Sequence, residues 1–98
     1  MNIEKLWYIQ APNNDELIFR FKFEGIDEML GYRYNNTTQK VIFMRGVAND
    51  QTVSLIKSHE NNYKRQWIQA LILLALKDDR YNQYHQRLKN MRIRCTVI

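Results

Sequence analysis

A run of strict alternation between residues 17 and 24 is the feature that most constrains the fold. Phe19, Phe21 and Phe23 alternate there with one arginine, one lysine and one glutamate. Because successive side chains of a β-strand point to opposite faces of the sheet, a period of two places one face in the core and the other in water. The segment therefore predicts a strand with a buried phenylalanine face and an exposed charged face.

Three other stretches of the first half are predicted to be strands that pair with this one. They cover residues 3–10, 32–34 and 40–45, and segments rich in turn-forming residues separate them. In the first stretch, the alternation places Trp7 and Ile9 on one face of the sheet and the residues between them on the other.

The second half is predicted to be helical. A short helix is expected to begin at Asn49 or Asp50 and to end near Lys57, because Asn and Asp are favoured at helix N-caps. A longer helix is expected to begin at Asn61 or Asn62 for the same reason.

The longer helix ends in the segment Ala70–Leu76, which is apolar on every side. A helix of this kind must be covered all round. The sheet is expected to cover one side. Two alternatives remain for the other side, namely the last helix or a second copy of the chain, so a homodimer through this segment is open.

The last helix is predicted from Asp78 or Asp79 to about Lys89, and a strand is predicted over residues 91–98. Apolar and polar residues alternate over that strand, which is expected to return to the sheet. The predicted fold class is therefore α+β. It consists of an antiparallel sheet of about four or five strands, with two to three helices packed on one face and a C-terminal strand returning to the sheet.

The whole chain is expected to form a single domain over residues 1–98. Within it, residues 1–48 form the β-rich half, residues 49–90 the helical half and residues 91–98 the closing strand. A hydrophobic fraction of 45% is sufficient for one core in a domain of this size and argues against global disorder.

Positive charge is concentrated toward the C-terminus. Residues 61–98 carry a net charge of +6, residues 1–60 carry −1, and the whole chain carries +5. Such a field attracts anions, whether they are phosphates, acidic proteins or membrane lipids. The charge indicates a binding protein without identifying what it binds.

Five basic residues are predicted to share the exposed face of the sheet. Arg20 and Lys22 face solvent if helices cover the phenylalanine face. The neighbouring strand adds Arg33, and the closing strand adds Arg92 and Arg94. Such a surface can neutralise phosphates without reading bases. The alternative interpretation is that the cations keep an exposed sheet soluble and discourage edge pairing.

A second basic surface is predicted on the last helix. Lys77, Arg80 and Arg87 lie on one flank of it, beside Tyr84. Basic residues next to tyrosines can bind single-stranded nucleic acid by charge and stacking. The alternative is that the tyrosine belongs to the core and that the cations cover this core with their aliphatic stems.

No motif indicates catalysis, a cofactor or a metal site. The sequence has no phosphate-binding loop and no dinucleotide fingerprint. His59 and His85 have no neighbouring Ser or Cys nucleophile, and Cys95 is interpreted as a small buried hydrophobe. Glu24, Asp27 and Glu28 form an acidic cluster of the kind that can hold a divalent metal, but around a Gly-containing turn they are interpreted as solvated turn residues. A cytoplasmic location without membrane association is expected, because neither a signal peptide nor an apolar run of about 20 residues is found.

The expected function is that of a non-enzymatic binding protein, which docks through basic and aromatic surface onto an acidic protein or nucleoprotein partner. Sequence-independent nucleic-acid binding is the second hypothesis, and a small enzyme with an unrecognised site is the third. The small size, the Asn-, Gln-, Tyr- and Lys-rich composition and the absence of catalytic motifs are similar to those of accessory proteins of phages and mobile elements. That resemblance implies an inhibitor or modulator of a host defence complex.

Overall fold

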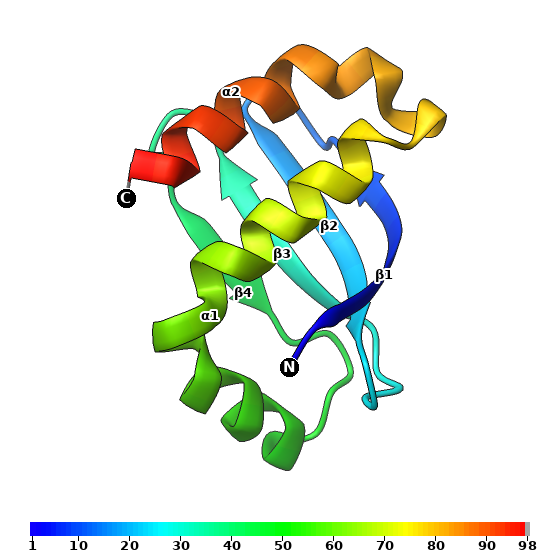
Figure 1. The fold of residues 1–98 in the computed structure, drawn as a ribbon, viewed down its shortest axis with the longest axis vertical. Helices are drawn as coiled ribbons and strands as arrows, with labels where there is room; N and C mark the ends of the chain where they lie inside the picture. Colours follow the sequence, from blue (N-terminus) through cyan, green and yellow to red (C-terminus); the bar gives the residue numbers. More distant parts are fainter. Residues whose placement is uncertain (98) are drawn as a thin grey trace.

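The computed structural model describes residues 1–97, with side chains described through Cys95, as an antiparallel sheet followed by helices (Figure 1). The four strands stand in the sheet in sequence order, so β1 and β4 form its two edges. The elements are β1 (Ile3–Gln10), β2 (Glu16–Phe23), β3 (Leu30–Asn35), β4 (Val41–Met44), α1 (Asp50–Leu76), the 3-10 helix η1 (Asp79–Tyr84) and α2 (His85–Val97). This is an α+β fold.

β2 has the two faces that its alternation predicts. Phe19, Phe21 and Phe23 are buried, whereas the residues between them lie on the opposite face of the sheet. β3 contributes Tyr32 and Tyr34 to the same buried face, and the Tyr32 ring stacks on Phe21 with ring centroids 5.5 Å apart. The phenylalanine face therefore forms the sheet side of the hydrophobic core.

β1 departs from simple alternation. Leu6 and Ile9 are its buried residues, and Trp7 and Tyr8 are both exposed. The register against β2 shifts between Leu6 and Tyr8, as at a β-bulge, where two residues oppose one on the partner strand. The prediction that Trp7 and Ile9 share a face is therefore wrong, because the bulge moves the phase of the strand by one residue.

A single helix, α1, replaces the two helices that were predicted between residues 49 and 76. Asn49 caps it, and the Asn49 side chain accepts a hydrogen bond from the Thr52 amide at 2.8 Å. Asn61 and Asn62 lie inside this helix and cap nothing. Both are exposed, so their side chains reach water at little cost and the helix continues through them.

α1 crosses one face of the sheet, with α2 beside its C-terminal half (Figure 1). Its buried residues join one core with the inward side chains of the strands: Ile56, Trp67, Ile68, Leu71, Ile72 and Ala75. Trp67 packs edge-on against Phe23 at 4.7 Å and donates its indole N–H to the Met1 carbonyl at 3.0 Å. Among the described residues, no helix is long and apolar enough to cross a membrane.

The predicted C-terminal strand is wrong for the described residues, because 85–97 form the helix α2; Ile98 lies outside the described part of the chain. Leu88, Met91 and Cys95 are buried, and their spacing by three and four residues fits one face of a helix. Ile93, which the strand would have pointed into the core, is 66% exposed. Helical packing against the core therefore overrides the local alternation.

The two edges of the sheet differ in how their backbone groups are used. On β1, the Tyr81 hydroxyl accepts a hydrogen bond from the Ile9 amide at 3.2 Å, and Arg80 donates to the Trp7 carbonyl at 3.3 Å. η1 therefore closes the β1 edge. At the β4 edge, the Lys64 ammonium donates to the Val41 carbonyl at 2.9 Å.

Candidate functional site: the open sheet face and the β4 edge

The sheet face opposite the helices carries the candidate binding surface, here called the open face. Two rows of cross-strand neighbours define its centre. One row is Gln10, Ile18, Arg33 and Ile42, and the other is Tyr8, Arg20, Gly31 and Met44. Aromatic, aliphatic and basic side chains therefore alternate over this surface.

Arg20 occupies the middle of the open face. Gly31, its cross-strand neighbour, leaves room for the guanidinium: the Arg20 Nη1 lies 3.1 Å from the position that a Cβ at Gly31 would take. The Arg20 Nε is buried without a hydrogen-bond partner. Within the described residues, the Arg20 side chain forms neither a hydrogen bond nor an ion pair. It is therefore a positive group held in place by packing and not by an acid of its own chain.

The other two predicted cations from these strands are neutralised. Lys22 pairs with Glu4 at 2.9 Å and lies 3.9 Å from Asp27. Arg33 forms a two-pronged pair with Glu16, in which Arg33 Nη2 to Glu16 Oε1 measures 2.8 Å. The hydrogen bonds from the Arg33 guanidinium, and to a lesser extent from an asparagine in the β1–β2 turn, lower the pKa of Glu16 to about 2. The open face is therefore less positive than the sequence alone indicates.

Arg92 and Arg94 do not join the open face, because they lie on α2. The Arg94 guanidinium donates to the Asn36 carbonyl at 3.0 Å and so ties α2 to the turn between β3 and β4. The predicted surface of five cations is therefore reduced to Arg20, Lys22 and Arg33. Arg92 and Arg94 lie apart from the three strand cations because the C-terminal segment is a helix and does not join the sheet.

The second predicted surface is largely structural. Arg87 donates to the carbonyls of Glu16 and Asn13 at 2.7 and 3.3 Å, and thereby holds α2 against the turn between β1 and β2. The Arg80 guanidinium pairs with Asp78 at 2.7 Å, and its hydrogen bonds lower the pKa of that carboxyl.

Tyr84 and Lys77 complete that second set. Tyr84 is half-buried, with the guanidinium of Arg87 5.8 Å from its ring centroid. Lys77 is exposed at the end of α1, and no side-chain contact of it is found in the described part of the chain. Of the four residues predicted on this flank, only Lys77 has a side chain that can contact a partner without first breaking a contact within the described part of its own chain.

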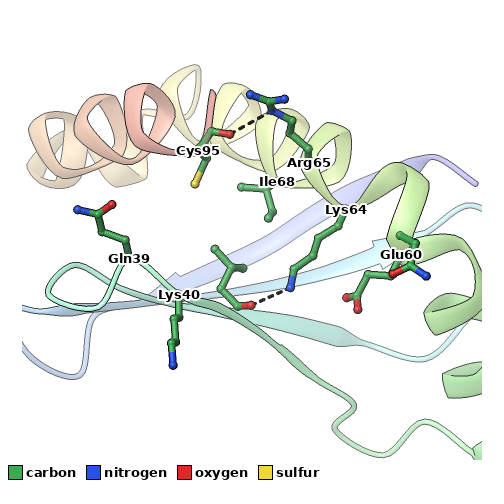
Figure 2. A pocket seen from close by; sticks show the side chains of 9 residues that line it. Gln39, Lys40, Glu60, Lys64, Arg65, Ile68 and Cys95 are labelled. Carbon is green, nitrogen blue, oxygen red and sulfur yellow. Dashed lines mark hydrogen bonds between the residues drawn. The ribbon is translucent and has the colours of Figure 1, made fainter. Parts of the chain in front are cut away.

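A cleft of about 520 Å³ lies between α1 and the β4 edge, and sequence reasoning missed it (Figure 2). Its lining residues come from the turn before β4, from β4, from α1 and from α2: Gln39, Lys40, Val41, Glu60, Asn61, Lys64, Arg65, Ile68 and Cys95. Figure 2 shows Lys64 reaching the Val41 carbonyl at the strand edge, and Arg65 reaching the Cys95 carbonyl on the opposite wall. No local motif marks this cleft, because four separate segments form it.

Two reactive side chains in the cleft, Cys95 and Glu60, are held by burial or by a hydrogen bond. Burial raises the pKa of the Cys95 thiol, which therefore stays protonated and poorly nucleophilic at neutral pH. The Glu60 carboxylate accepts a hydrogen bond from the Tyr32 hydroxyl at 2.7 Å. Within residues 1–97, no group of three His, Cys, Asp or Glu side chains is arranged to hold a metal ion.

Three residues of the open face were absent from the sequence-based set. Tyr8 is 37% exposed, Ile42 is 58% exposed and Met44 is partly exposed. Residues 40–45 are an apolar run, which is typical of a central strand, so the pattern alone predicts that Ile42 and Met44 are covered on both sides of the sheet. β4 is instead an edge strand with one face uncovered. Comparisons with protein-family models, with curated proteins and with solved structures gave no match.

Proposed function

We propose that this chain is a non-enzymatic docking protein whose open face binds an acidic surface of a protein or nucleoprotein partner. The observation that carries the proposal is Arg20, an unpaired guanidinium fixed beside Gly31 on a face that no described helix covers. A partner that covers Arg20 removes it from water, which is costly unless the partner supplies an acceptor. A carboxylate can accept two parallel hydrogen bonds from a guanidinium, and such charge-assisted pairs are among the stronger hydrogen bonds of proteins.

The surroundings of Arg20 support a protein partner. Tyr8, Ile42 and Met44 lie in the two rows that contain or flank it. Tyrosine, methionine and arginine are enriched at protein–protein interfaces, and tyrosine and arginine dominate their energetic hot spots. A partner can therefore bury apolar surface around a single charged anchor.

The ion pairs on the open face argue against nucleic acid as the main target. Nucleic-acid affinity comes chiefly from cations that replace counterions along the phosphate backbone. Lys22 and Arg33 are already paired with carboxylates of this chain. Arg87 and Arg94 are bound to backbone carbonyls. Few cations of the predicted sets are left to follow a phosphate backbone.

The test is affinity capture from cells that contain the gene, with wild-type protein compared with two variants. Arg20→Gln with Ile42→Thr removes the anchor and an exposed apolar residue of the same face but keeps polar length and β-propensity. Lys57→Gln with Lys89→Gln is the control on exposed residues of α1 and α2. A partner that docks on the open face is retained by the wild type and by the control, and is weakened by at least about tenfold in the first variant. Nuclease treatment leaves the capture unchanged.

Salt titration with labelled single-stranded and double-stranded oligonucleotides tests the nucleic-acid hypothesis directly. Direct phosphate binding gives a steep linear fall of log affinity with log salt, and removing one contacting cation reduces the slope by about one unit. The proposal is wrong if the Arg20 and Ile42 variant captures the same protein as the wild type, or if the wild type captures nucleic acid and no protein component.

A further inference from the structure

The free edge of β4 and the cleft beside it form one continuous feature. In an antiparallel pair, the N–H and C=O of one residue point together, either toward the neighbouring strand or away from it. The Val41 carbonyl points away from β3, because it accepts a hydrogen bond from Lys64 on the other side. Two residues further on, Phe43 presents its amide and carbonyl to the same side. β4 therefore offers a pairing edge next to the cleft.

We infer that this edge accepts an extended acidic segment of the partner as a fifth strand, which places carboxylates in the cleft; the inference rests on the proposed function. An exposed strand edge is a template for strand addition, in which main-chain hydrogen bonds give affinity and pockets for alternate side chains give specificity. Tyr81 and Arg80 bind the Ile9 amide and the Trp7 carbonyl on the β1 edge, and the register of β1 shifts twice, so the more regular β4 edge is the better template for an added strand.

Charge decides which side chains enter the cleft. Lys64 and Arg65 border it against one carboxylate, that of Glu60, whereas the side chain of Lys40 points away from it (Figure 2). Glu60 already accepts a hydrogen bond from Tyr32. The lining is therefore positive and takes acidic side chains, whereas Val41 and Ile68 give it an apolar wall against which the stems of those side chains pack.

Side chains of an added strand alternate between the two faces of the sheet. Those on the helix side enter the cleft, and those on the other side extend the open face next to Ile42, which is exposed there. The segment that fits best therefore alternates acidic with apolar residues. A second copy of this chain fits poorly, because pairing two β4 edges brings two positive clefts together. Lys64, which caps the Val41 carbonyl in the free protein, turns to a carboxylate when the strand binds.

The test is a titration of the isotope-labelled protein, followed by amide chemical shifts, with three blocked hexapeptides. The first alternates valine and glutamate, the second has the same composition as three valines followed by three glutamates, and the third alternates valine and glutamine. The alternating acidic peptide shifts the amides of Val41 and Phe43, protects the Phe43 amide from hydrogen exchange, and binds more tightly than the other two. Lys64→Gln with Arg65→Gln weakens it about tenfold, whereas the control Lys57→Gln with Lys89→Gln leaves it unchanged.

The inference is overturned if the three peptides bind equally, if the shifts map away from β4, or if no shifts occur at several millimolar peptide. It is also overturned if sedimentation shows a dimer whose Phe43 amide is already protected, or if a single-stranded oligonucleotide gives the same shifts with higher affinity. Its failure is distinguishable from that of the proposed function. A captured partner that is lost with Arg20→Gln but kept with Lys64→Gln and Arg65→Gln leaves docking on the open face standing and removes the added strand.

Discussion

Replacing Tyr81 by Phe tests whether η1 closes the β1 edge. The Tyr81 hydroxyl accepts the hydrogen bond of the Ile9 amide, and both residues are buried, Ile9 at 8% and Tyr81 at 5% exposure. Phenylalanine keeps the ring in the core and removes only the acceptor. The Ile9 amide is then left without its partner in a place that water reaches poorly.

The expected loss of stability in Tyr81→Phe follows from the hydrogen bond that the substitution removes. A hydrogen bond contributes about 0.5–1.5 kcal/mol net, and a buried donor left unsatisfied costs about 1–3 kcal/mol. Because the amide lies at a sheet edge, where a small movement admits water, we expect a loss of about 1–2 kcal/mol. In a domain of this size that corresponds to a fall in Tm of about 5–15 °C.

The assay combines thermal unfolding with hydrogen exchange resolved by residue. Tyr84→Phe is the matched control, since Tyr84 lies in the same helix and its hydroxyl makes no hydrogen bond within the described residues. We expect the Ile9 amide to lose protection in Tyr81→Phe beyond the general loss, and to keep it in Tyr84→Phe. The reasoning is refuted if Tyr81→Phe changes Tm by less than about 1 °C and leaves exchange at Ile9 unaltered.

Three further predictions concern stability and reactivity. The pKa of Glu16 is about 2 in the folded protein against 4.5 ordinarily, so its ion pair stabilises the fold above pH 4.5 and this contribution is lost as the pH falls toward 2. Urea midpoints measured between pH 7 and pH 3 should therefore fall less steeply in Glu16→Gln than in the wild type; parallel curves would contradict this. Asn49→Ala removes the cap of α1 and should cost about 1 kcal/mol in chemical unfolding, whereas Asn61→Ala, inside the helix, should be neutral or stabilising. The Cys95 thiol should react with an aromatic disulfide reagent far more slowly in the folded than in the urea-unfolded protein, and equal rates would show that α2 does not pack Cys95 against the core.

The strands of the first half could be predicted because their signal is local. With a phenylalanine at every second position, β2 can bury all three rings together only as a strand with one buried face. The pattern of the C-terminal segment is compatible with two conformations, a strand and a helix. Cys95 fits a period of two with Ile93, and it also fits helical spacing with Leu88 and Met91. Only contact with the core chooses between them, and burial of Leu88 and Met91 selects the helix.

The candidate site could be predicted only in part, because charge pairing depends on segments that are distant in sequence. Glu16 and Arg33 meet across neighbouring strands, 17 positions apart. Arg87 reaches the Glu16 carbonyl from 71 positions away. The sequence shows a block of positive charge, whereas the fold uses Arg87 and Arg94 from that block to attach α2 to two turns. What remains for binding is set by which cations have no partner in their own chain.

The helical C-terminus also determines where a partner can add to the sheet. A closing strand over residues 91–98 would have added Arg92 and Arg94 to the sheet and would have occupied an edge. As a helix, the same segment instead packs Leu88 and Met91 on the core and brings Cys95 to the far wall of the cleft. The β4 edge is thus left with Lys64 on one carbonyl, and with a positive cleft on the helix side. Arg20 and the β4 edge lie in the same sheet, separated by a single strand, β3. In the proposed docking mode, a partner that covers the open face can therefore also reach the β4 edge, so the two proposals describe parts of one interface.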